Sequence, residues 1–354
     1  MITVRPATET DASAWQAFLG ETASGDFLHD WEWAAVASFD GQPQRRFVAE
    51  QDGKLVAIAA AQVRPLPLGR AFWYVPHGPV LDYDHAQAFD RLRALIIGLR
   101  EAARDAGAIA VKFEPRLPAA GPAGGAFERL RLRREPGTLQ VGQTRLVPLG
   151  EDAAMLAAFD KDTRYAVRRA EREGVEVTIL DDAGDLAAID RLHALVVETQ
   201  QRAGFPMPSG ERYRLVWRRL GGAGRARILE ARHDGRLLAS GMLVLEGWRS
   251  FYLYAGSLRE GPGEPKRYAT YALQWAMMRS ARDAGARLHD LWGVAPPGAG
   301  PEHRWYGVGL FKKGFGGEEV AWAGTWDLII SPDLYRLRRA LAIGRTLPRR
   351  LLGR

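Results

Sequence analysis

Two adjacent lysines lie in a short segment rich in glycine and aromatic residues, residues 305–317 with the sequence WYGVGLFKKGFGG. Glycine lets a backbone approach a ligand closely, and a lysine held at such a place supplies a cation for a phosphate or a developing oxyanion. If the segment is extended, Lys312 and Lys313 point to opposite faces of the strand. The alternative interpretation is a β-hairpin with a glycine turn and two solvated lysines. The pattern therefore indicates a candidate catalytic cation without excluding ordinary surface charge.

A second group of cations lies in residues 160–174, with the sequence DKDTRYAVRRAEREG. This segment predicts a helix that is capped by Asp162 or Thr163 and ends at Gly174. Arginines that recur every four residues form one basic stripe on that helix, which consists of Arg164, Arg168 and Arg172. Like charges in a row do not stabilise a helix, so the stripe is either a solvated face or a site for a phosphate-rich partner.

The absence of several motifs excludes common classes of enzyme. The chain has no cysteine, which excludes disulfides, thiolate metal sites and cysteine nucleophiles. Neither a P-loop of the form G-x-x-x-x-G-K-[ST] nor a G-x-S-x-G turn occurs in the sequence. The seven histidines never form a pair spaced as H-x-x-x-H. We therefore expect no metal centre and no P-loop nucleotide hydrolysis.

Length and composition are those of a soluble protein with two domains of ordinary size, since the chain has 354 residues, of which 47% are hydrophobic and 26% charged. The N-terminus lacks an apolar signal core and no apolar run reaches spanning length, so we expect a cytoplasmic protein. The segment 336–354 holds seven arginines and no acidic residue, which accounts for the whole formal charge of +7. Such a tail suits an anionic membrane surface or RNA, and a solvated amphipathic helix is the alternative.

The order of expected elements repeats once along the chain. Residues 44–63 predict a β-hairpin around Asp52-Gly53, and residues 226–245 predict another around Asp234-Gly235. Each hairpin is followed by a further strand, by a helix that ends in the sequence RDAGA, and by another strand. Because two such matches occur at nearly equal separation, we predict an α/β (α+β) fold with two copies of one unit, each a mixed sheet flanked by helices.

The repeated unit resembles the acyl-CoA N-acyltransferase (GNAT) fold, which holds the pyrophosphate of CoA on a loop of the form [RQ]-x-x-G-x-[GA] before a helix. At that place residues 259–263, REGPG, are one residue short and include Pro262, which lacks a backbone donor. Residues 118–150, rich in glycine, proline and arginine, form the expected boundary region. We predict one domain from 1–149 plus 326–354, and a second from 150–325.

Four motifs make a more specific resemblance, and they are YVPHGPVLD, TRYAVRRAEREGVEV, YATYALQWAMMRSARDAGARLHDLWGV and GLFKKGFGG. Over nearly the whole chain the sequence resembles the FemABX family of peptidoglycan interpeptide-bridge aminoacyltransferases. Members transfer an amino acid from aminoacyl-tRNA to the stem-peptide amine of a UDP-MurNAc-pentapeptide or of lipid II. The resemblance implies two tandem GNAT-like domains, a monomer, and no cofactor besides aminoacyl-tRNA as co-substrate. Peripheral association with the inner membrane surface would fit lipid II. The coiled-coil arm of some members is not expected here, because no long heptad stretch occurs.

The resemblance also implies catalytic residues. Phe311 and Lys312 match the Phe-Lys pair that contacts the acceptor end of the tRNA and steadies the transition state. Asp82 lies in the motif that lines the precursor cleft and is a candidate acceptor for the proton of the amine. Substrate groups could take that proton instead, so the presence of a protein base stays open.

Binding residues follow from the same resemblance. Tyr74 lies in the motif that lines the precursor cleft, and Tyr254 lies on the strand beside it. Arg202 and Tyr213 are further candidates for substrate binding, while the arginine stripe and Lys313 are candidates for tRNA binding. At Ala37 the family tends to have a lysine for the phosphate of the precursor. This difference favours lipid II or another acceptor over the soluble nucleotide.

The proposed chemistry needs no ATP, since an aminoacyl ester is already activated. Two other classes of function remain open. One is a GNAT-like N-acyltransferase that uses acyl-CoA or another acyl donor, which CoA binding would identify. The other is a non-catalytic RNA- or envelope-binding protein, for which Lys312 would be dispensable and the arginines of the tail would not.

Overall fold

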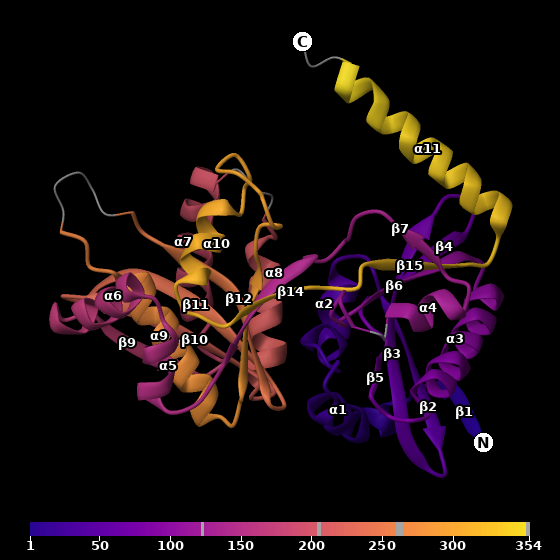
Figure 1. Ribbon diagram of the computed structural model, residues 1–354, viewed down its shortest axis with the longest axis horizontal. Coiled ribbons are helices and arrows are strands. Elements are labelled where there is room, and N and C mark those ends of the chain that lie inside the picture. The colour runs from indigo at the N-terminus through magenta and orange to yellow at the C-terminus, as the bar shows by residue number, and fades with distance from the viewer. Residues whose placement is uncertain (122–123, 204–206, 260–264, 352–354) are drawn as a thin grey trace.

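The protein folds into two lobes, each built around one mixed β-sheet with helices packed on it (Figure 1). The computed structural model describes residues 1–121, 124–203, 207–259 and 265–351, and for residues 202–203 and 342–351 it describes only the backbone. The predicted fold, two tandem GNAT-like units with mixed sheets, is confirmed by this arrangement.

The first lobe has an eight-stranded sheet in the order β1-β2-β3-β4-β6-β15-β7, with β5 paired to β3 off this path. Its strands are β1 (Ile2–Pro6), β2 (Gln44–Gln51), β3 (Lys54–Leu66), β4 (Arg70–His77), β5 (Val80–Leu81), β6 (Ala108–Pro115), β7 (Arg133–Glu135) and β15 (Thr325–Ile329). Strands β4 and β6 are parallel, and the other neighbours are antiparallel.

The second lobe has a seven-stranded sheet in the order β9-β10-β11-β12-β13-β8-β14. Its strands are β8 (Gln143–Pro148), β9 (Glu176–Leu180), β10 (Ala226–His233), β11 (Arg236–Glu246), β12 (Arg249–Ser257), β13 (Leu288–Gly293) and β14 (Glu318–Ala321). Strands β12 and β13 are parallel and the rest are antiparallel, so the two sheets share one strand order and one pattern of directions.

The two lobes exchange one strand each. Strand β15, which follows the second lobe in the chain, lies between β6 and β7 of the first sheet. Strand β8, which follows the first lobe, takes the equivalent place between β13 and β14 of the second sheet. In Figure 1 the segment that carries β14 and β15 crosses from one lobe to the other. Each sheet therefore includes one strand that adjoins the other lobe in the sequence, β15 in the first sheet and β8 in the second.

Helices pack on the sheets of both lobes. The helices of the first lobe are α1 (Ala12–Glu21), α2 (Trp33–Phe39), α3 (Ala88–Asp105) and α4 (Gly124–Arg129). Those of the second are α5 (Asp152–Ala158), α6 (Lys161–Arg172), α7 (Leu186–Ala203), α8 (Gly210–Val216), which continues through residues 217–221 as a π-helical turn, α9 (Ala269–Asp283) and α10 (Tyr306–Lys313). In the first lobe α3 lies on one face of the sheet, and α1 packs on the other through Trp15 and Leu19.

The hairpin turns confirm the predicted duplication. Asp52 and Gly53 have φ values of 51° and 73°, and Asp234 and Gly235 have φ values of 48° and 77°. Consecutive positive φ values are those of a type I′ turn, which matches the twist of the flanking strands and favours an Asx-Gly pair. These turns connect β2 to β3 and β10 to β11, at equivalent places in the two sheets.

Two local expectations need correction. The boundary at 149/150 would leave β8 with the first domain, whereas this strand pairs with β13 and β14 in the second sheet. The segment 118–150 also holds α4, β7 and β8, so it is not an irregular linker. The cap of α6 is Asp160 rather than Asp162 or Thr163, because its carboxylate accepts a hydrogen bond from the backbone N–H of Thr163.

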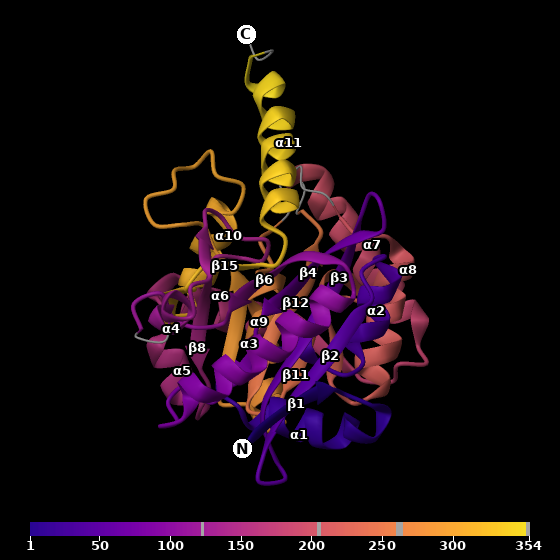
Figure 2. The ribbon, with the colours of Figure 1, turned by 90° about the vertical axis from the view of Figure 1, so that its right-hand side faces the viewer.

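The C-terminal helix, α11 (Pro332–Leu351), starts on the first lobe and then projects away from it (Figure 2). Tyr335 anchors its first turns, because the ring packs with Phe72 and Ile109 and the hydroxyl donates to Asp327. Leu341 is exposed further along the helix. None of the described helices is both long and apolar enough to span a bilayer.

Candidate active site

The parallel strand pair of each lobe is paired over a different length. In the first lobe residues 71–77 of β4 pair with residues 108–115 of β6. In the second lobe only residues 249–251 of β12 pair with residues 288–290 of β13, although both strands continue. We call the region where β12 and β13 separate the strand fork. Backbone groups that do not pair across such a fork are available to a ligand or to side chains.

The two lysines that the sequence singles out lie on α10, beside the fork. The expected extended conformation of residues 305–317 is wrong, because residues 306–313 are helical despite two glycines. Aromatic packing outweighs the low helix propensity of glycine here. The ring centroid of Tyr271 on α9 lies 5.1 Å from that of Phe311 and 5.9 Å from that of Phe315. Phe311 thus helps to fix α10 on the second lobe.

Lys312 is buried and Lys313 is exposed, as the positions of consecutive residues on a helix about 100° apart allow. The Nζ atom of Lys312 donates to the carbonyl oxygen of Gly293 at 2.7 Å, at the end of β13. Burial lowers the pKa of Lys312 to about 8, although the carboxylate of Asp290 opposes that shift. An ammonium that is 5% exposed and held against the fork is not a solvated surface charge. Its catalytic role stays a prediction.

A chain of buried charged groups joins the lobes next to the fork. Asp290 on β13 accepts a hydrogen bond from Arg116 of the first lobe at 2.8 Å. The Nε atom of Arg116 lies 3.5 Å from a carboxylate oxygen of Asp26, and the Nδ1 atom of His77 lies 2.8 Å from the same oxygen. All four side chains are buried, so the charges of Asp26, Arg116 and Asp290 depend on their neighbours for compensation.

The pocket that receives residues from both lobes adjoins this chain, and we call it the interlobe pocket. It has a volume of about 280 Å³. Its walls come from the two sheets and from helices of both lobes, and they include Phe27, Trp33, Ala37, Gln62, Arg64, Gln140, Arg212, Tyr254 and Trp292. Trp292 stands at the fork, so the pocket and the fork share a wall.

The interlobe pocket contains two arginines in different situations. Arg212 is compensated, because its Nε atom lies 2.8 Å from Asp40 and its guanidinium donates to the hydroxyl of Tyr254 at 2.6 Å. Arg64 stacks on the ring of Tyr74 at 4.6 Å and has neither an ion pair nor a hydrogen bond to any described residue. Desolvation lowers the pKa of Arg64, yet an arginine stays charged. Among the described residues, the nearby carboxylate of Glu114 opposes that shift without pairing directly with Arg64, so the pocket offers a cation without an ion pair to a ligand.

Several predicted binding residues lie at this pocket, and others support it. Tyr254 lines the pocket directly. Tyr213 is buried behind it, stacked on its ring at a centroid distance of 4.2 Å. Tyr74 is fully buried, and its hydroxyl donates to Glu114 at 2.5 Å, so Tyr74 supports the wall through Arg64 rather than contacting a ligand. The prediction for Tyr74 as a lining residue is thus corrected.

Asp82 lies apart from the interlobe pocket. It is exposed and accepts a hydrogen bond from the backbone N–H of Asp84, in a separate pocket of about 820 Å³ beside α3. Arg116 lines that pocket too, and through Asp26 and Asp290 it connects the pocket to the charged chain. Asp82 consequently makes no direct contact with the buried groups at the fork.

The basic stripe on α6 is only partly free. Arg168 and Arg172 are exposed, whereas the guanidinium of Arg164 turns back and donates to the carbonyl oxygen of Phe159. Arg169, which is outside the predicted stripe, pairs with Glu173 at 2.6 Å. The side chain of Arg202, another predicted binding residue, lies outside the described residues.

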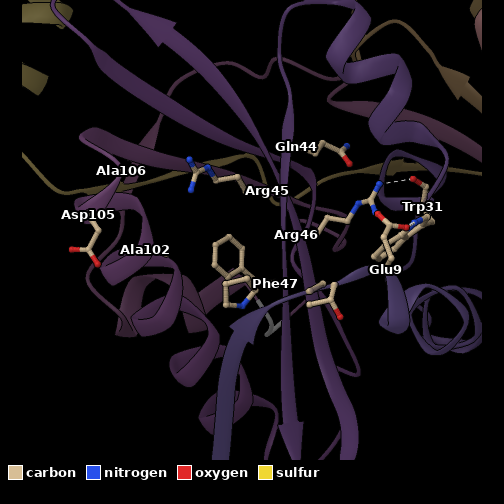
Figure 3. Close-up of a pocket in the computed structure, with 12 residues that line it drawn as sticks. Glu9, Trp31, Gln44, Arg45, Arg46, Phe47, Ala102, Asp105 and Ala106 are labelled. Carbon is tan, nitrogen blue, oxygen red and sulfur yellow. Dashed lines mark hydrogen bonds between the residues drawn. The ribbon is translucent and has the colours of Figure 1, made fainter.

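The largest concavities are elsewhere. Figure 3 shows a pocket of about 810 Å³ on the first lobe, between β2 and the end of α3. Arg46 stacks on Trp31 there at 3.6 Å and donates to its carbonyl oxygen. None of the residues predicted from the sequence lines this pocket. Size alone therefore does not identify the site.

Five functional candidates were not predicted from the sequence, and they are Asp26, Arg64, His77, Arg116 and Asp290. His77, in the motif YVPHGP, and Asp290, in LHDLWG, stand in segments that the sequence singles out, and this was the available signal. Arg64 and Arg116 carry no such local signal, because each is one of many arginines and is distinguished only by its partners or the lack of them.

Comparison with known proteins agrees with the tandem fold. The FemAB family model matches residues 10–121, and the acetyltransferase (GNAT) domain model matches residues 157–303. The chain is 23% identical over 334 residues to the UDP-N-acetylmuramoylpentapeptide-lysine N(6)-alanyltransferase of Weissella viridescens, covering 91% of this chain and 94% of that protein. It is also 23% identical to the lipid II:glycine glycyltransferase of Staphylococcus aureus, covering 91% and 92% of the two chains.

Among solved structures, the crystal structure of FemX superposes with a TM-score of 0.85, at 20% sequence identity, over 95% of this chain and 99% of that one. This likeness shows that the two share the tandem fold. Together with the FemAB match and the two transferases, it confirms the resemblance that the motifs indicate.

Proposed function

We propose that this chain, a FemABX-type tandem GNAT protein, is an aminoacyltransferase that moves an amino acid from aminoacyl-tRNA to the stem-peptide amine of a peptidoglycan precursor. The named relatives are an alanyltransferase for a UDP-MurNAc-pentapeptide and a glycyltransferase for lipid II, and this supports a precursor of that class as the acceptor. The product would be one amino acid of an interpeptide bridge. The protein would act as a monomer at the cytoplasmic side of the membrane.

The observation that carries the proposal is the buried ammonium of Lys312 at the strand fork. Attack of an amine on the aminoacyl ester creates an oxyanion, and a donor already fixed in a dry site stabilises it without reorganisation. Lys312 keeps N–H groups beyond the one that Gly293 accepts. One preorganised donor is typically worth roughly 2.7–4 kcal/mol, and alignment of the amine with the ester contributes up to about 7–11 kcal/mol more.

The acceptor would occupy the interlobe pocket. Arg64 would pair with an anionic group of the precursor, since a guanidinium without an ion pair in a half-buried site gains most from a phosphate or carboxylate. In this respect Arg64 takes the role of the lysine that is absent at Ala37, a residue of the same pocket. The donor would approach the fork from the side of α10, with Phe311 and Lys313 near its acceptor end and Arg168 and Arg172 near its phosphates.

A direct assay tests this function. The protein would be incubated with a mixture of labelled aminoacyl-tRNAs and either lipid II or UDP-MurNAc-pentapeptide, and the products would be analysed by mass. We expect the mass of the precursor to rise by one amino-acid residue, with no requirement for ATP. Absence of any transfer, with a known Fem transferase active in the same mixture, would contradict the proposal.

A second candidate is N-acyl transfer from acyl-CoA, which the match of residues 157–303 to a GNAT domain model favours. A pocket of about 370 Å³ at the start of α9 carries Arg259 and Lys266, which suit a pyrophosphate. A thermal shift with CoA at micromolar concentration, together with no transfer from aminoacyl-tRNA, would replace the first function by this one.

Helix α11 would hold the protein at an anionic membrane. Its exposed face combines Arg336 with Leu337 and Leu341, and each basic residue near such a surface contributes about 1 kcal/mol. Truncation after Leu341 keeps the buried Tyr335 but removes four of the seven arginines of residues 336–354, so it should strongly weaken sedimentation with vesicles of phosphatidylglycerol. Turnover on the soluble precursor should persist, and loss of both properties would argue for a structural role instead.

A further inference from the structure

His77 is a buried side chain near the fork whose contacts with the described residues give it the geometry of a base. It ends β4 and is 2% exposed. Its Nδ1 atom lies 2.8 Å from Asp26, whereas its Nε2 atom has no hydrogen-bond partner among the described residues. A carboxylate that accepts from Nδ1–H fixes the tautomer in which Nε2 carries a lone pair.

The carboxylate of Asp26 is suited to this task. Burial alone would raise the pKa of Asp26, but His77 and Arg116 outweigh the desolvation, and the pKa lies below its usual range. Asp26 also accepts from the backbone N–H of Leu28 at 3.0 Å, which fixes the direction of the carboxylate. Contacts with Leu28, His77 and Arg116 thus fix the carboxylate of Asp26 before any ligand binds.

His77 lines a small cavity between the lobes. His77, Glu114, Gln140 and Trp322 line this cavity, whose volume of about 10 Å³ corresponds to about one water molecule. Gln140 lines the interlobe pocket as well, and the ring of Trp292, at the fork, lies 5.3 Å from the imidazole. The cavity that His77 lines and the interlobe pocket therefore share Gln140 as a wall.

The backbone of His77 is also unusual. Its φ of 45° is in the left-handed region, which costs a residue other than glycine about 1 kcal/mol or more. Gly78, the next residue, has no room for a Cβ, which would lie 2.4 Å from the Nε2 atom of His29. The surroundings therefore hold His77 in a strained conformation that points its ring at Asp26 and the cavity.

We propose that His77 and Asp26 form a general-base pair that takes the proton of the acceptor amine, through one water molecule in the cavity beside Nε2. This assignment rests on the proposed aminoacyl transfer. As the nitrogen of the amine forms its bond to the ester carbon, one N–H proton moves through the water to Nε2. When the bond from that carbon to the ribose oxygen breaks, the same proton returns to this oxygen, which leaves as the 3′-terminal hydroxyl of the tRNA. The products are an amide and a free tRNA end, with no net proton released.

The test compares His77 with His29, a matched residue. His29 is buried to the same degree, but both its ring nitrogens are engaged, Nε2 with the carbonyl oxygen of Pro76 at 2.7 Å and Nδ1 with the backbone N–H of Ala60 at 3.2 Å. The full chain and the variants His77→Gln, Asp26→Asn and His29→Gln would be assayed with labelled aminoacyl-tRNAs and lipid II, after circular dichroism confirms folding. The charged or titratable groups around the imidazole are Asp26, His29, Glu114, Arg116 and Asp290, so the pH profile must be recorded for each variant.

We expect His77→Gln to lower kcat on the order of 100-fold or more and to abolish the fall of kcat at acid pH, with little change in either KM. Asp26→Asn should lower kcat in the same way, because asparagine no longer fixes one tautomer. The folded fraction of His29→Gln should keep kcat within about threefold and keep the acid limb. If His77→Gln turns over normally or keeps that limb while the wild-type chain is active, the base assignment is overturned and the transferase function stands. If the wild-type chain transfers nothing, both are overturned.

Discussion

The two lobes share one strand order but treat their central parallel pair differently. In the first lobe β4 and β6 stay paired up to His77 and Pro115, and the sheet is closed. In the second lobe β12 and β13 part after Phe251 and Asp290, and a buried lysine stands at the opening. The two copies of the duplicated unit thus share one architecture, but only the second lobe has an opening between its parallel strands.

This difference assigns separate tasks to the lobes. Under the proposed function, the open pair of the second lobe, with Lys312 beside it, would hold the reacting ester, since charge would develop there in the transition state. The closed lobe has no such opening, and it contributes Arg64 to the wall of the interlobe pocket and His77 to the charged chain. On this view, substitutions in the second lobe change kcat, and those in the first lobe change KM unless they touch the charged chain.

The largest expected effect is at Lys312. Lys312→Met should lower kcat by about 100-fold or more, as removal of one preorganised donor does. Because burial lowers the pKa of Lys312 to about 8, its ammonium costs folded-state stability below that pH, and the melting temperature should not fall at pH 7. In the wild-type protein, kcat should decline as the pH rises through about 8.

Lys313→Met is the control, since Lys313 adjoins Lys312 but is exposed. If Lys312→Met and Lys313→Met had similar small effects on kcat, the opening in the second sheet would have no catalytic cation. The proposed chemical difference between the two lobes would then be wrong.

A smaller effect is expected on the closed side, at Arg64. Arg64→Ala should raise the KM for the precursor roughly 10- to 100-fold and leave kcat nearly unchanged, because one charge-assisted contact of about 1.5–3 kcal/mol is lost in ground state and transition state alike. Arg45→Ala, on the neighbouring strand and outside the interlobe pocket, serves as the matched control. A fall in kcat without a change in KM would show that recognition is not the task of Arg64.

The arginines of α6 should affect the other substrate, and more weakly. Neutralising Arg168 and Arg172 together should raise the KM for aminoacyl-tRNA several-fold and reduce the slope of its salt dependence by about 1–2. Arg164→Ala, in contrast, should leave the slope unchanged, because its guanidinium is engaged with Phe159. An unaltered slope in the double variant would identify these arginines as a solvated face.

The contact between the lobes gives the smallest effect, on stability. Burial, and then the nearby Asp30, raise the pKa of Glu246 to about 8. The folded state therefore keeps a proton that the unfolded state releases, and stability falls as the pH rises from about 4.5 to about 8. Glu246→Gln should flatten this dependence and raise stability at pH 8 on the order of 1 kcal/mol, as thermal melts at several pH values would measure. An unchanged pH dependence of stability in Glu246→Gln would show that the titration of Glu246 does not cause it.

Local chemistry made much of the fold predictable. The two Asp-Gly turns specify left-handed backbone wherever they occur, and the hairpins follow directly. The conformation of residues 306–313 was not predictable in this way, because Gly307 and Gly309 disfavour a helix and only the packing of Phe311 on Tyr271 reverses that preference. The placement of β8 in the second sheet was also beyond the sequence, although residues 326–354, which hold most of β15, were predicted to return to the first domain.

The candidate site was predictable where one segment carries it and not where distant residues meet. Lys312 stood out because glycines and aromatics surround it. The pair of Asp26 and His77, and the ion pair of Arg116 with Asp290, join residues far apart in the chain, and each member is ordinary by itself. Tyr74 shows that a residue in the right motif can still be assigned wrongly. It was predicted to line the precursor cleft, but it is buried and its hydroxyl donates to Glu114.

The strand exchange has a consequence for the order in which the protein is made. Synthesis proceeds from the N-terminus at about 5–20 residues per second, so the first sheet waits for β15 until almost the entire chain has left the ribosome. During that interval the edge of β6 that will receive β15 is unpaired, and open strand edges are sites of wrong association. A chain that stops after α10 would keep that edge open permanently. Premature termination near the C-terminus should therefore yield aggregation of the N-terminal half, although every residue of that half has been made.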